Sequence, residues 1–398
     1  MLRKGYAVAA ATAAAAFVTA CSTVAPTTET TFGEIIVPSD GDRAAIGEIV
    51  DAHNVTTALI GVMDGGALVW MAAYGEEAPG IPADADTRMN VASITKTVVA
   101  ETALRLADKG AINLDEPMAD YWVDPDIKDD PRTQKLTARH ALTHSTGFPN
   151  WRFFRSDRKL VFMHEPGAAH SYSGEGFEYL ARYMEAKLGR PLPDLVASEV
   201  FEPIGMTNSA IAANREATDG LAQPRDADGA FYGYFCRPPW QGGACLSDGS
   251  YSAAGGMSAS APDYAAFLKS VLESEGYSSQ LSAERSTVLV AEAGEDAIVR
   301  CVREERTPCP NAQGYGLGFE VLTYDNETVI GHTGWDWSEL TAAYAYEESG
   351  DGVIVLLNTQ PERGLPAMTA ILRLLDPASP FLAQFERWEA REAAKAAE

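Results

Sequence analysis

The order of strand-like and helix-like segments along the chain constrains its fold more than any other feature. Residues 57–63 and 67–74 are strand-like runs joined by Asp64-Gly65-Gly66, a hairpin signal. From about 113 to 249 the chain has short helical patterns interrupted by many Pro and Gly residues. Because strand-like runs return after this region, the pattern predicts an α+β fold, with one lobe built from both ends of the chain and a mainly helical lobe inserted at about 113–249. The later runs are 315–324, 328–331, 340–346 and 353–358.

Apolar residues recur at helical spacing in several segments. The strongest signals are 94–107 and 175–188, each closely followed by glycine. Ser379-Pro380 suits the N-cap and first position of a helix, so residues 379–398 are expected to form an amphipathic C-terminal helix. Further helices are expected at 44–53, 261–272 and 365–375.

The N-terminal segment is typical of an export signal. Arg3 and Lys4 precede an uncharged, apolar run at 7–20, and Cys21 follows directly. The run has the length of a signal hydrophobic region and is shorter than the roughly 20 residues that span a bilayer. It resembles a bacterial lipoprotein signal, so we expect residues 1–20 to be a signal peptide and Cys21 to carry a lipid anchor facing the periplasm or cell envelope. Ordinary cleavage that leaves Cys21 as a free thiol is the alternative.

Composition distinguishes a tether near the N-terminus from the folded domain that follows it. The net charge of the chain excludes nucleic acid as a partner. Residues 21–42 are rich in Thr, Pro and Gly and are expected to form a tether before a domain at 43–378. The chain holds 31 Lys and Arg against 56 Asp and Glu, a formal net charge of −25. Because a nucleic-acid binder needs a basic face to neutralise phosphates, we expect no nucleic-acid partner.

The four cysteines after Cys21 are expected to form disulfides, because export leads to an oxidising compartment. The local connectivity, Cys236–Cys245 and Cys301–Cys309, closes two short loops and is favoured among the three pairings. Four free, buried thiols are the alternative. None of the spacings is C-x-x-C, so neither a zinc ribbon nor a thioredoxin-type site is expected.

The pattern Ser-x-x-Lys occurs twice, and its surroundings separate the two copies. Ser93 and Lys96 open the long apolar helix, whereas Ser156 and Lys159 lie in a charged run. At a helix start, a hydroxyl lies near unpaired backbone N–H groups and the positive end of the dipole, which favour a developing alkoxide. A Lys three residues on shares the same helical face. Ser93 is therefore the candidate nucleophile, with a simple N-cap as the alternative.

Seven ordered segments, taken together, resemble the serine hydrolase family that includes class C β-lactamases, D-amino-acid peptidases and related esterases, which are penicillin-binding-protein-like. The resemblance runs from about residue 43 to 375. It implies a β-lactamase/transpeptidase-like fold, an antiparallel sheet flanked by helices, and no metal or organic cofactor. The segments are 93–96, 136–147, 165–167 with Tyr172-Ser173-Gly174, 201–206, 252–257, 315–319 and 331–335.

The resemblance assigns catalytic roles to individual positions. Ser93 matches the acylated nucleophile and Lys96 the Lys that shares its proton network. Tyr172 matches the Tyr that acts as base for the nucleophile and then as acid for the leaving group. The backbone N–H groups of Ser93 and Trp335 match the oxyanion hole. A Tyr has a free pKa of about 10, so we expect the Lys96 cation to lower the Tyr172 pKa.

Two positions depart from the family pattern. Gly174 replaces the Asn of the Tyr-x-Asn element, which removes an amide donor. His332-Thr333-Gly334 replaces Lys-Thr-Gly, the element that lines the substrate site. If His332 anchors a substrate carboxylate through its protonated form, its pKa is expected near 6.5 unless burial lowers it or a bound carboxylate raises it. A mere hydrogen-bonding or structural role for His332 is the alternative. Both departures weaken the case for β-lactam hydrolysis and favour the esterase and peptidase members.

Two weaker patterns suggest metal ligands. His140 and His144 are four residues apart, but residue 141 is Ala, so H-E-x-x-H is absent and a structural role is expected. An acidic cluster in 115–130 is interpreted as a solvated face, with calcium binding as the alternative. We therefore expect no metal site. Four aromatic residues are candidates for an apolar acyl pocket or for core: Phe148, Trp151, Trp335 and Trp337.

The sequence thus predicts an exported, lipid-anchored serine hydrolase that forms an acyl-enzyme on Ser93. An ester or small amide substrate ranks first, a D-amino-acid or cell-wall peptide second and a β-lactam third. A catalytically inactive, envelope-binding lipoprotein is the alternative from a different class. The presence of Ser93, Lys96 and Tyr172 together argues against that alternative.

Overall fold

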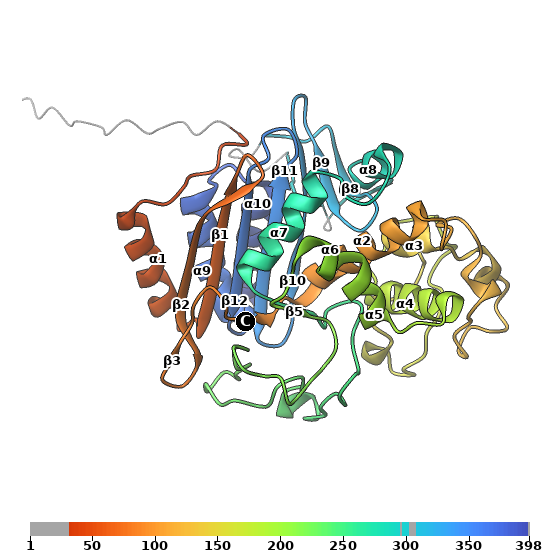
Figure 1. The fold of residues 1–398 in the computed structure, drawn as a ribbon, viewed down its shortest axis with the longest axis horizontal. Coiled ribbons are helices and arrows are strands. Elements are labelled where there is room, and N and C mark those ends of the chain that lie inside the picture. The colour runs from red at the N-terminus through yellow and green to blue at the C-terminus, as the bar shows by residue number, and fades with distance from the viewer. Residues whose placement is uncertain (1–31, 295–296, 302–307, 397–398) are drawn as a thin grey trace, which may run out of the picture. The chain divides into compact units, whose positions relative to one another are not determined.

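An antiparallel sheet formed by both ends of the chain is the framework of the fold (Figure 1). In the computed structural model, which describes residues 32–294, 297–301 and 308–396, nine strands pair in the order β3-β2-β1-β12-β11-β10-β9-β8-β7. The hairpin predicted at 57–74 is present as β1 and β2, and β1 pairs directly with the last strand, β12. The strands are β1 Thr57–Asp64, β2 Ala67–Ala78, β3 Ile81–Pro82, β7 Val290–Ala291, β8 Ala312–Tyr315, β9 Glu320–Thr323, β10 Thr328–Trp335, β11 Glu339–Tyr346 and β12 Gly352–Asn358.

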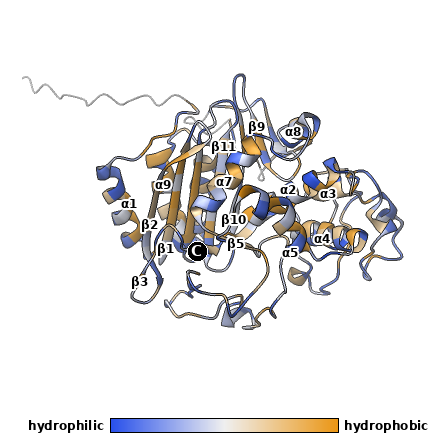
Figure 2. Ribbon diagram, viewed as in Figure 1, coloured by the Kyte–Doolittle hydropathy of each residue, from blue (hydrophilic) through white to orange (hydrophobic). Residues whose placement is uncertain are grey.

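Helices cover both faces of this sheet, which explains the long apolar strands at its centre. In β12, Val353, Val355 and Leu357 join one apolar cluster, while Ile354 and Leu356 join the other. This alternation is the period of two expected when a strand is buried on both sides. Apolar residues follow the central strands and α9 in Figure 2. The first cluster packs under α1 Asp40–Ala52, α9 Pro361–Leu375 and α10 Pro380–Ala396, and the second under α2 Thr95–Asp108 and α7 Ala261–Leu272.

The predicted helical region comes between the hairpin and the later strands in the chain, and in Figure 1 its helices α3, α4 and α5 lie to the right of the sheet. Its longest helix, α4 Gly174–Leu188, is capped by Ser173, whose Oγ accepts a hydrogen bond from the Gly176 N–H, and it ends at Gly189 with a left-handed φ of 65°. A small sheet of β4 Met89–Asn90, β5 Ser209–Ala210 and β6 Ser258–Ala259 joins this region to the main sheet's helices. The shorter helices are α3 Ala138–Leu142, α5 Leu192–Val196, α6 Glu202–Ile204 and α8 Ser279–Arg285.

The strand prediction at 315–324 is wrong in one respect. The segment is not one strand, because β8 and β9 run antiparallel and a turn at 316–319 separates them. Gly318 has a φ of 89°, and a Cβ there would lie 2.1 Å from the Ala100 Cβ on α2. This turn therefore needs glycine, and it brings β8 and β9 close to the helix that follows Ser93.

One further boundary differs from the prediction. β10 continues beyond residue 331 to Trp335, so the whole His332-Thr333-Gly334 element lies within a strand. The C-terminal helix α10 packs Phe381 and Phe385 into the sheet's core. Residues 1–31, which hold the predicted signal peptide and Cys21, lie outside the described residues.

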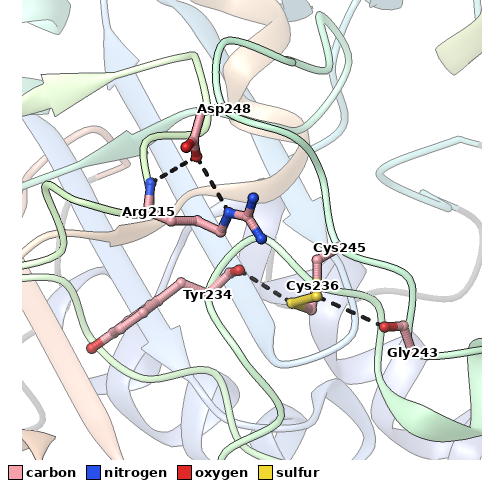
Figure 3. The surroundings of a disulfide bond; sticks show 6 residues. All are labelled: Arg215, Tyr234, Cys236, Gly243, Cys245 and Asp248. Carbon is pink, nitrogen blue, oxygen red and sulfur yellow. Dashed lines mark hydrogen bonds and ion pairs between the residues drawn. A yellow bond between two sulfur atoms is a disulfide. The ribbon is translucent and has the colours of Figure 1, made fainter.

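Cys236 is paired with Cys245 and Cys301 with Cys309, the local connectivity among the three. Figure 3 shows the first disulfide beside the ion pair of Arg215 with Asp248. Within the described part of the chain, no helix has both the length and the apolar character needed to cross a membrane.

Candidate active site

A tight turn before α2 presents Ser93. Ala92 has a φ of 51°, a conformation that costs about 1 kcal/mol or more for a residue with a Cβ. The Asn90 side chain accepts the Ala92 N–H at 3.0 Å, and the short 3-10 turn Ala92–Ile94 leads into α2. Ser93 is partly exposed, while its neighbours Ala92 and Ile94 are buried. The turn thus holds the hydroxyl of Ser93 out toward solvent.

Lys96 lies directly behind this hydroxyl. Its Nζ is 3.0 Å from Ser93 Oγ and donates a hydrogen bond to the Ala254 carbonyl at 2.6 Å. Lys96 is 1% exposed, and this burial lowers its pKa to about 7, against the opposing charges of Glu178 and Asp336. At neutral pH a large fraction of Lys96 is therefore an uncharged amine in contact with the candidate nucleophile.

The segment at 252–257 makes hydrogen bonds both to the turn before α2 and to Lys96. The Val91 N–H donates to the Met257 carbonyl at 2.9 Å, and the Met257 N–H donates to Thr95 Oγ1 at 3.1 Å. Glu178 on α4 accepts from Ser252 Oγ at 2.6 Å. The start of α2 is therefore held from two sides.

Tyr172 completes the group, and it lines the same cavity as Ser93. Burial raises the pKa of Tyr172 above its usual value, the Ser93 side chain partly counteracts this rise, and the charges of Glu320 and Glu292 add to it. The expectation that Lys96 lowers the Tyr172 pKa is wrong. The Lys96 Nζ lies 4.9 Å from the centre of the Tyr172 ring, and it too is stripped of water, so burial dominates for both groups.

His144 holds the Tyr172 ring in place. The two rings stack with centroids 4.3 Å apart, and His144 Nδ1 accepts the Ser173 N–H at 3.0 Å. Burial and the charge of Lys96 lower the His144 pKa well below its usual value, so the ring is neutral. This is the structural kind of role that the sequence predicts for His144, although its contact with Tyr172 could not be read from the sequence.

His332 lies in the same cavity but does not carry the expected charge. It is 1% exposed, and burial together with Lys96 lowers its pKa to about 3. Its Nδ1 donates to the Thr333 carbonyl at 2.5 Å, which leaves Nε2 as an acceptor 3.4 Å from the Tyr315 hydroxyl. Burial, which the expectation named as an exception, thus moves the titration away from 6.5, and a neutral His332 provides no charge to anchor a carboxylate.

The end of β10 passes close to the Ser93 turn. A Cβ at Gly334 would lie 2.1 Å from Thr341 Oγ1 and 2.9 Å from the Val91 carbonyl, and that hydroxyl donates to the same carbonyl at 2.9 Å. Gly334 thus permits β10 to approach the turn that carries Ser93. Ser93, Tyr172, His332, Thr333 and Trp335 all line one cavity of about 1840 Å³.

Gly174, the second departure, has a structural cause. A Cβ at this position would lie 2.5 Å from the Trp151 ring. The indole of Trp151 occupies the space that the side chain of an Asn would need. Trp151 lines the cavity, as do Trp335 and Trp337, whereas Phe148 is fully buried in the core.

One wall of the cavity is the stapled loop, residues 232–246, which the Cys236–Cys245 disulfide closes (Figure 3). The Arg237 N–H donates to the Ala244 carbonyl at 2.9 Å, which extends the pairing next to the disulfide. The Arg237 guanidinium lies 5.1 Å from the centre of the Phe153 ring in the helical region. The stapled loop therefore reaches across the cavity mouth.

Other candidates lie apart from this group. Ser156 and Lys159 are exposed and outside any helix. Within the described residues, no three His, Cys, Asp or Glu side chains converge as a metal site requires. Sequence reasoning did not single out Glu178 or Glu320. The signal for Glu320 was a lone acidic residue inside an apolar strand-like run, because acidic residues are rarely buried without a role.

Comparison with known sequences identifies relatives of this chain. The sequence profile of the Beta-lactamase family matches residues 43–376. The chain is 25% identical over 217 residues to the D-alanyl-D-alanine-carboxypeptidase/endopeptidase AmpH of Escherichia coli, an alignment that covers 49% of this chain and 54% of AmpH. The chain thus spans about half the length of that relative. It is 25% identical over 357 residues to the esterase EstB of Burkholderia gladioli, covering 77% of this chain and 87% of EstB.

A solved structure shows the same fold. The octameric penicillin-binding protein homologue from Pyrococcus abyssi aligns with a TM-score of 0.65 at 21% identity, covering 86% of this chain and 78% of that chain. The fold is therefore the β-lactamase/transpeptidase-like α+β fold. Because the family profile spans most of the sequence, the chain belongs to the Beta-lactamase family.

Proposed function

We propose that this protein is a serine hydrolase that forms an acyl-enzyme on Ser93. The observation that carries the proposal is the 3.0 Å contact between Ser93 Oγ and the buried Lys96 Nζ, whose pKa is lowered to about 7. A serine hydroxyl is a poor nucleophile until a base takes its proton. The neutral Lys96 amine accepts that proton as Oγ attacks the carbonyl carbon of the substrate.

Tyr172 acts as the acid in this proposal. Its raised pKa keeps the phenol protonated, and Tyr172 lines the cavity next to Ser93, where the leaving group departs. When the tetrahedral intermediate collapses, the Tyr172 proton passes to the leaving-group atom, and the proton held by the Lys96 ammonium restores the phenol. The backbone N–H groups of Ser93 and Trp335 hold the oxyanion, each contributing about 3–4 kcal/mol. Water then attacks the acyl-enzyme in the reverse sequence of proton transfers.

An ester or small amide is the substrate class that the site favours. A neutral His332 provides no positive charge for a substrate carboxylate. The amide that an Asn at 174 would supply is absent, and the Trp151 ring fills its space. The likeness to the esterase EstB over most of both chains supports the same choice. A D-amino-acid or cell-wall peptide is the second candidate, supported by the likeness to AmpH, and a β-lactam the third. We further propose export and lipidation at Cys21.

Covalent labelling tests the mechanism. A fluorophosphonate probe should label the protein, and peptide mapping should place the label on Ser93. Ser93→Ala should abolish labelling and hydrolysis of p-nitrophenyl esters, while Ser156→Ala, in the exposed copy of the same motif, should change neither. A label on Ser156, or full activity in Ser93→Ala, would remove the mechanism. Parallel assays with D-amino-acid anilides and nitrocefin rank the three substrate classes.

A further inference from the structure

A buried carboxyl group with a free oxygen lies beside the catalytic group. Glu320, the first residue of β9, is 5% exposed, and its Oε1 accepts a hydrogen bond from the Tyr315 hydroxyl at 3.0 Å. Among the described residues, its Oε2 has no hydrogen-bond partner. Leaving a buried polar atom unpaired costs about 1–3 kcal/mol, so a cation or a hydrogen-bond donor from outside the chain would stabilise the ionised carboxylate. Glu320 lines the same cavity as Ser93, which gives a ligand a route to it.

Aromatic rings surround the approach to Glu320. The His170 and Tyr315 rings stack with centroids 5.4 Å apart, and the Tyr172 ring centre lies 6.3 Å from that of Tyr315. All three residues line the cavity together with Glu292 and Glu320. Ring faces attract cations through their quadrupole, and a carboxylate beside them adds a full negative charge. This combination is the chemistry that recognises an ammonium group.

The position of these groups relative to Ser93 identifies the half of the substrate that they meet. Tyr172, the proposed acid, must lie next to the leaving group, and Tyr315 links Tyr172 to Glu320. The oxyanion donors belong to the Ser93 turn and the end of β10 instead. The charges of Glu320 and Glu292 both raise the pKa of Tyr172, and Glu292 Oε1 lies 3.3 Å from His170 Nε2. The leaving-group side of the cavity therefore has a negative potential once Glu320 is ionised.

We propose that Glu320, through Oε2 and flanked by the rings of Tyr172, Tyr315 and His170, binds an ammonium group carried by the leaving group of the substrate. The inference rests on the proposed function and names its substrate class: esters of amino alcohols or amides of diamines. The same arrangement repels a leaving group that carries a carboxylate, because no cation faces it from β10, where His332 is neutral.

The preference for a cationic over a neutral leaving group should depend on pH through the ionisation of Glu320. Burial raises its pKa to about 8, so the carboxylate that attracts a cation forms only as the pH rises through that value. The groups that face Glu320 are Tyr315 on β8, His332 on β10, His170 and Tyr172 before α4, and Glu292 after β7. Lys96, whose Nζ lies 4.9 Å from the centre of the Tyr172 ring, gains its charge as the pH falls to about 7 and would also repel a cationic substrate. The part of the pH dependence that belongs to Glu320 is therefore the part that disappears in Glu320→Gln.

A matched pair of thioesters tests the proposal. Butyrylthiocholine and S-(3,3-dimethylbutyl) thiobutyrate have the same shape, but only the first has a quaternary ammonium on its leaving group. At pH 9 the wild-type kcat/KM, followed by thiol release, should favour butyrylthiocholine at least tenfold. This preference should fall as the pH is lowered from 9 to 7. A preference that is absent, or that does not vary with pH, would overturn the proposal.

Glu320→Gln keeps the shape of the side chain and removes its charge. It should bring the ratio of kcat/KM for the cationic thioester to kcat/KM for the neutral thioester close to one, so the cationic substrate must lose more than the neutral one. Glu362→Gln, at an exposed carboxylate that also lines the cavity, is the control and should leave the preference unchanged. An equal loss for both substrates would instead show that Glu320 acts only by positioning Tyr315.

Two further measurements separate the remaining outcomes. Choline should inhibit wild-type hydrolysis of p-nitrophenyl butyrate at least tenfold more strongly than 3,3-dimethylbutanol, a test that needs no variant. A neutral-thiol thioester of 4-(trimethylammonio)butyrate should lose no more kcat/KM on Glu320→Gln than the corresponding uncharged thioester; if it loses more, the assignment to the leaving group is wrong. Failure of the proposed function looks different, because neither thioester is then hydrolysed and Ser93 is not labelled.

Discussion

Burial sets the protonation of the two groups that flank Ser93, and it moves them in opposite directions. Removing water disfavours the charged form, which for Lys96 is the ammonium and for Tyr172 the phenolate. The pKa of Lys96 therefore falls to about 7 while that of Tyr172 rises. The base and the acid of the proposed reaction are in this way already in their working forms at neutral pH.

We expect the activity to follow the titration of Lys96. Because the neutral amine is the active form, kcat/KM for a neutral p-nitrophenyl ester should rise about tenfold per pH unit below pH 7 and level off above it. Lys96→Arg, which stays protonated, should lower kcat by about 10²- to 10⁴-fold. Lys159→Arg, in the exposed second copy of the motif, is the matched control. A profile that is flat from pH 5 to 9 would contradict the assignment of Lys96 as base.

Trp151 should control what position 174 tolerates. Gly174→Asn places a side chain where the Trp151 ring lies 2.5 Å away, so it should destabilise the fold by about 1–3 kcal/mol. Combining it with Trp151→Ala should recover a large part of that loss, because the ring is removed. Thermal unfolding of the two single variants and the double variant measures this coupling. Additive effects would show that Trp151 is not the obstacle.

The residues of the candidate site could be found from the sequence, but their charge states could not. Ser93, Lys96 and Tyr172 belong to spaced motifs, and the structure brings all three together. The pKa values of Tyr172 and His332 depend on burial, which no local pattern records. The partners of Glu320 come from β8 and from the cavity, so its environment exists only after the strands have assembled.

For the helices and strands, local sequence patterns gave wrong boundaries where contacts with distant segments determine the backbone conformation. The run 315–324 has strand-like composition throughout, but contact with Ala100 on α2 forces the turn at Gly318. β10 continues through His332-Thr333-Gly334, a sequence without apolar alternation, because β11 pairs along its whole length. Strand formation depends on neighbouring strands more than on intrinsic preference, so these boundaries needed the sheet itself.

The stapled loop offers a test at this scale. Replacing Cys236 and Cys245 together with Ser should raise KM for bulky esters severalfold, because the loop forms a wall of the cavity. The global melting temperature should change little, since the loop carries few core residues. Replacing Cys301 and Cys309 is the matched control, because neither is among the described residues that line the cavity. Equal effects on KM from both double variants would contradict a local role for the loop.

At the scale of the whole molecule, the α+β arrangement was predictable because strands and helices are segregated along the chain. The proposed anchor is independent of that fold. Cys21→Ser should move the protein from the membrane fraction to the soluble periplasm without changing its specific activity, because Cys21 precedes Ser93 by about seventy residues. Fractionation followed by an esterase assay measures both properties. A variant that stays with membranes would show that another feature holds it there.

The pairing of β1 with β12 determines how late in synthesis the centre of the sheet can form. Thr57 faces Asn358 across this ladder, so partners about 300 residues apart must meet before the centre of the sheet exists. The chain leaves the ribosome, or an export channel, N-terminus first, so β1 emerges long before β12. Until β12 has emerged, one apolar edge of β1 stays unpaired. Such non-local pairing is slow and exposed to aggregation. Loss of the last fifty residues would therefore remove the middle of the sheet, although it shortens only one end of the chain.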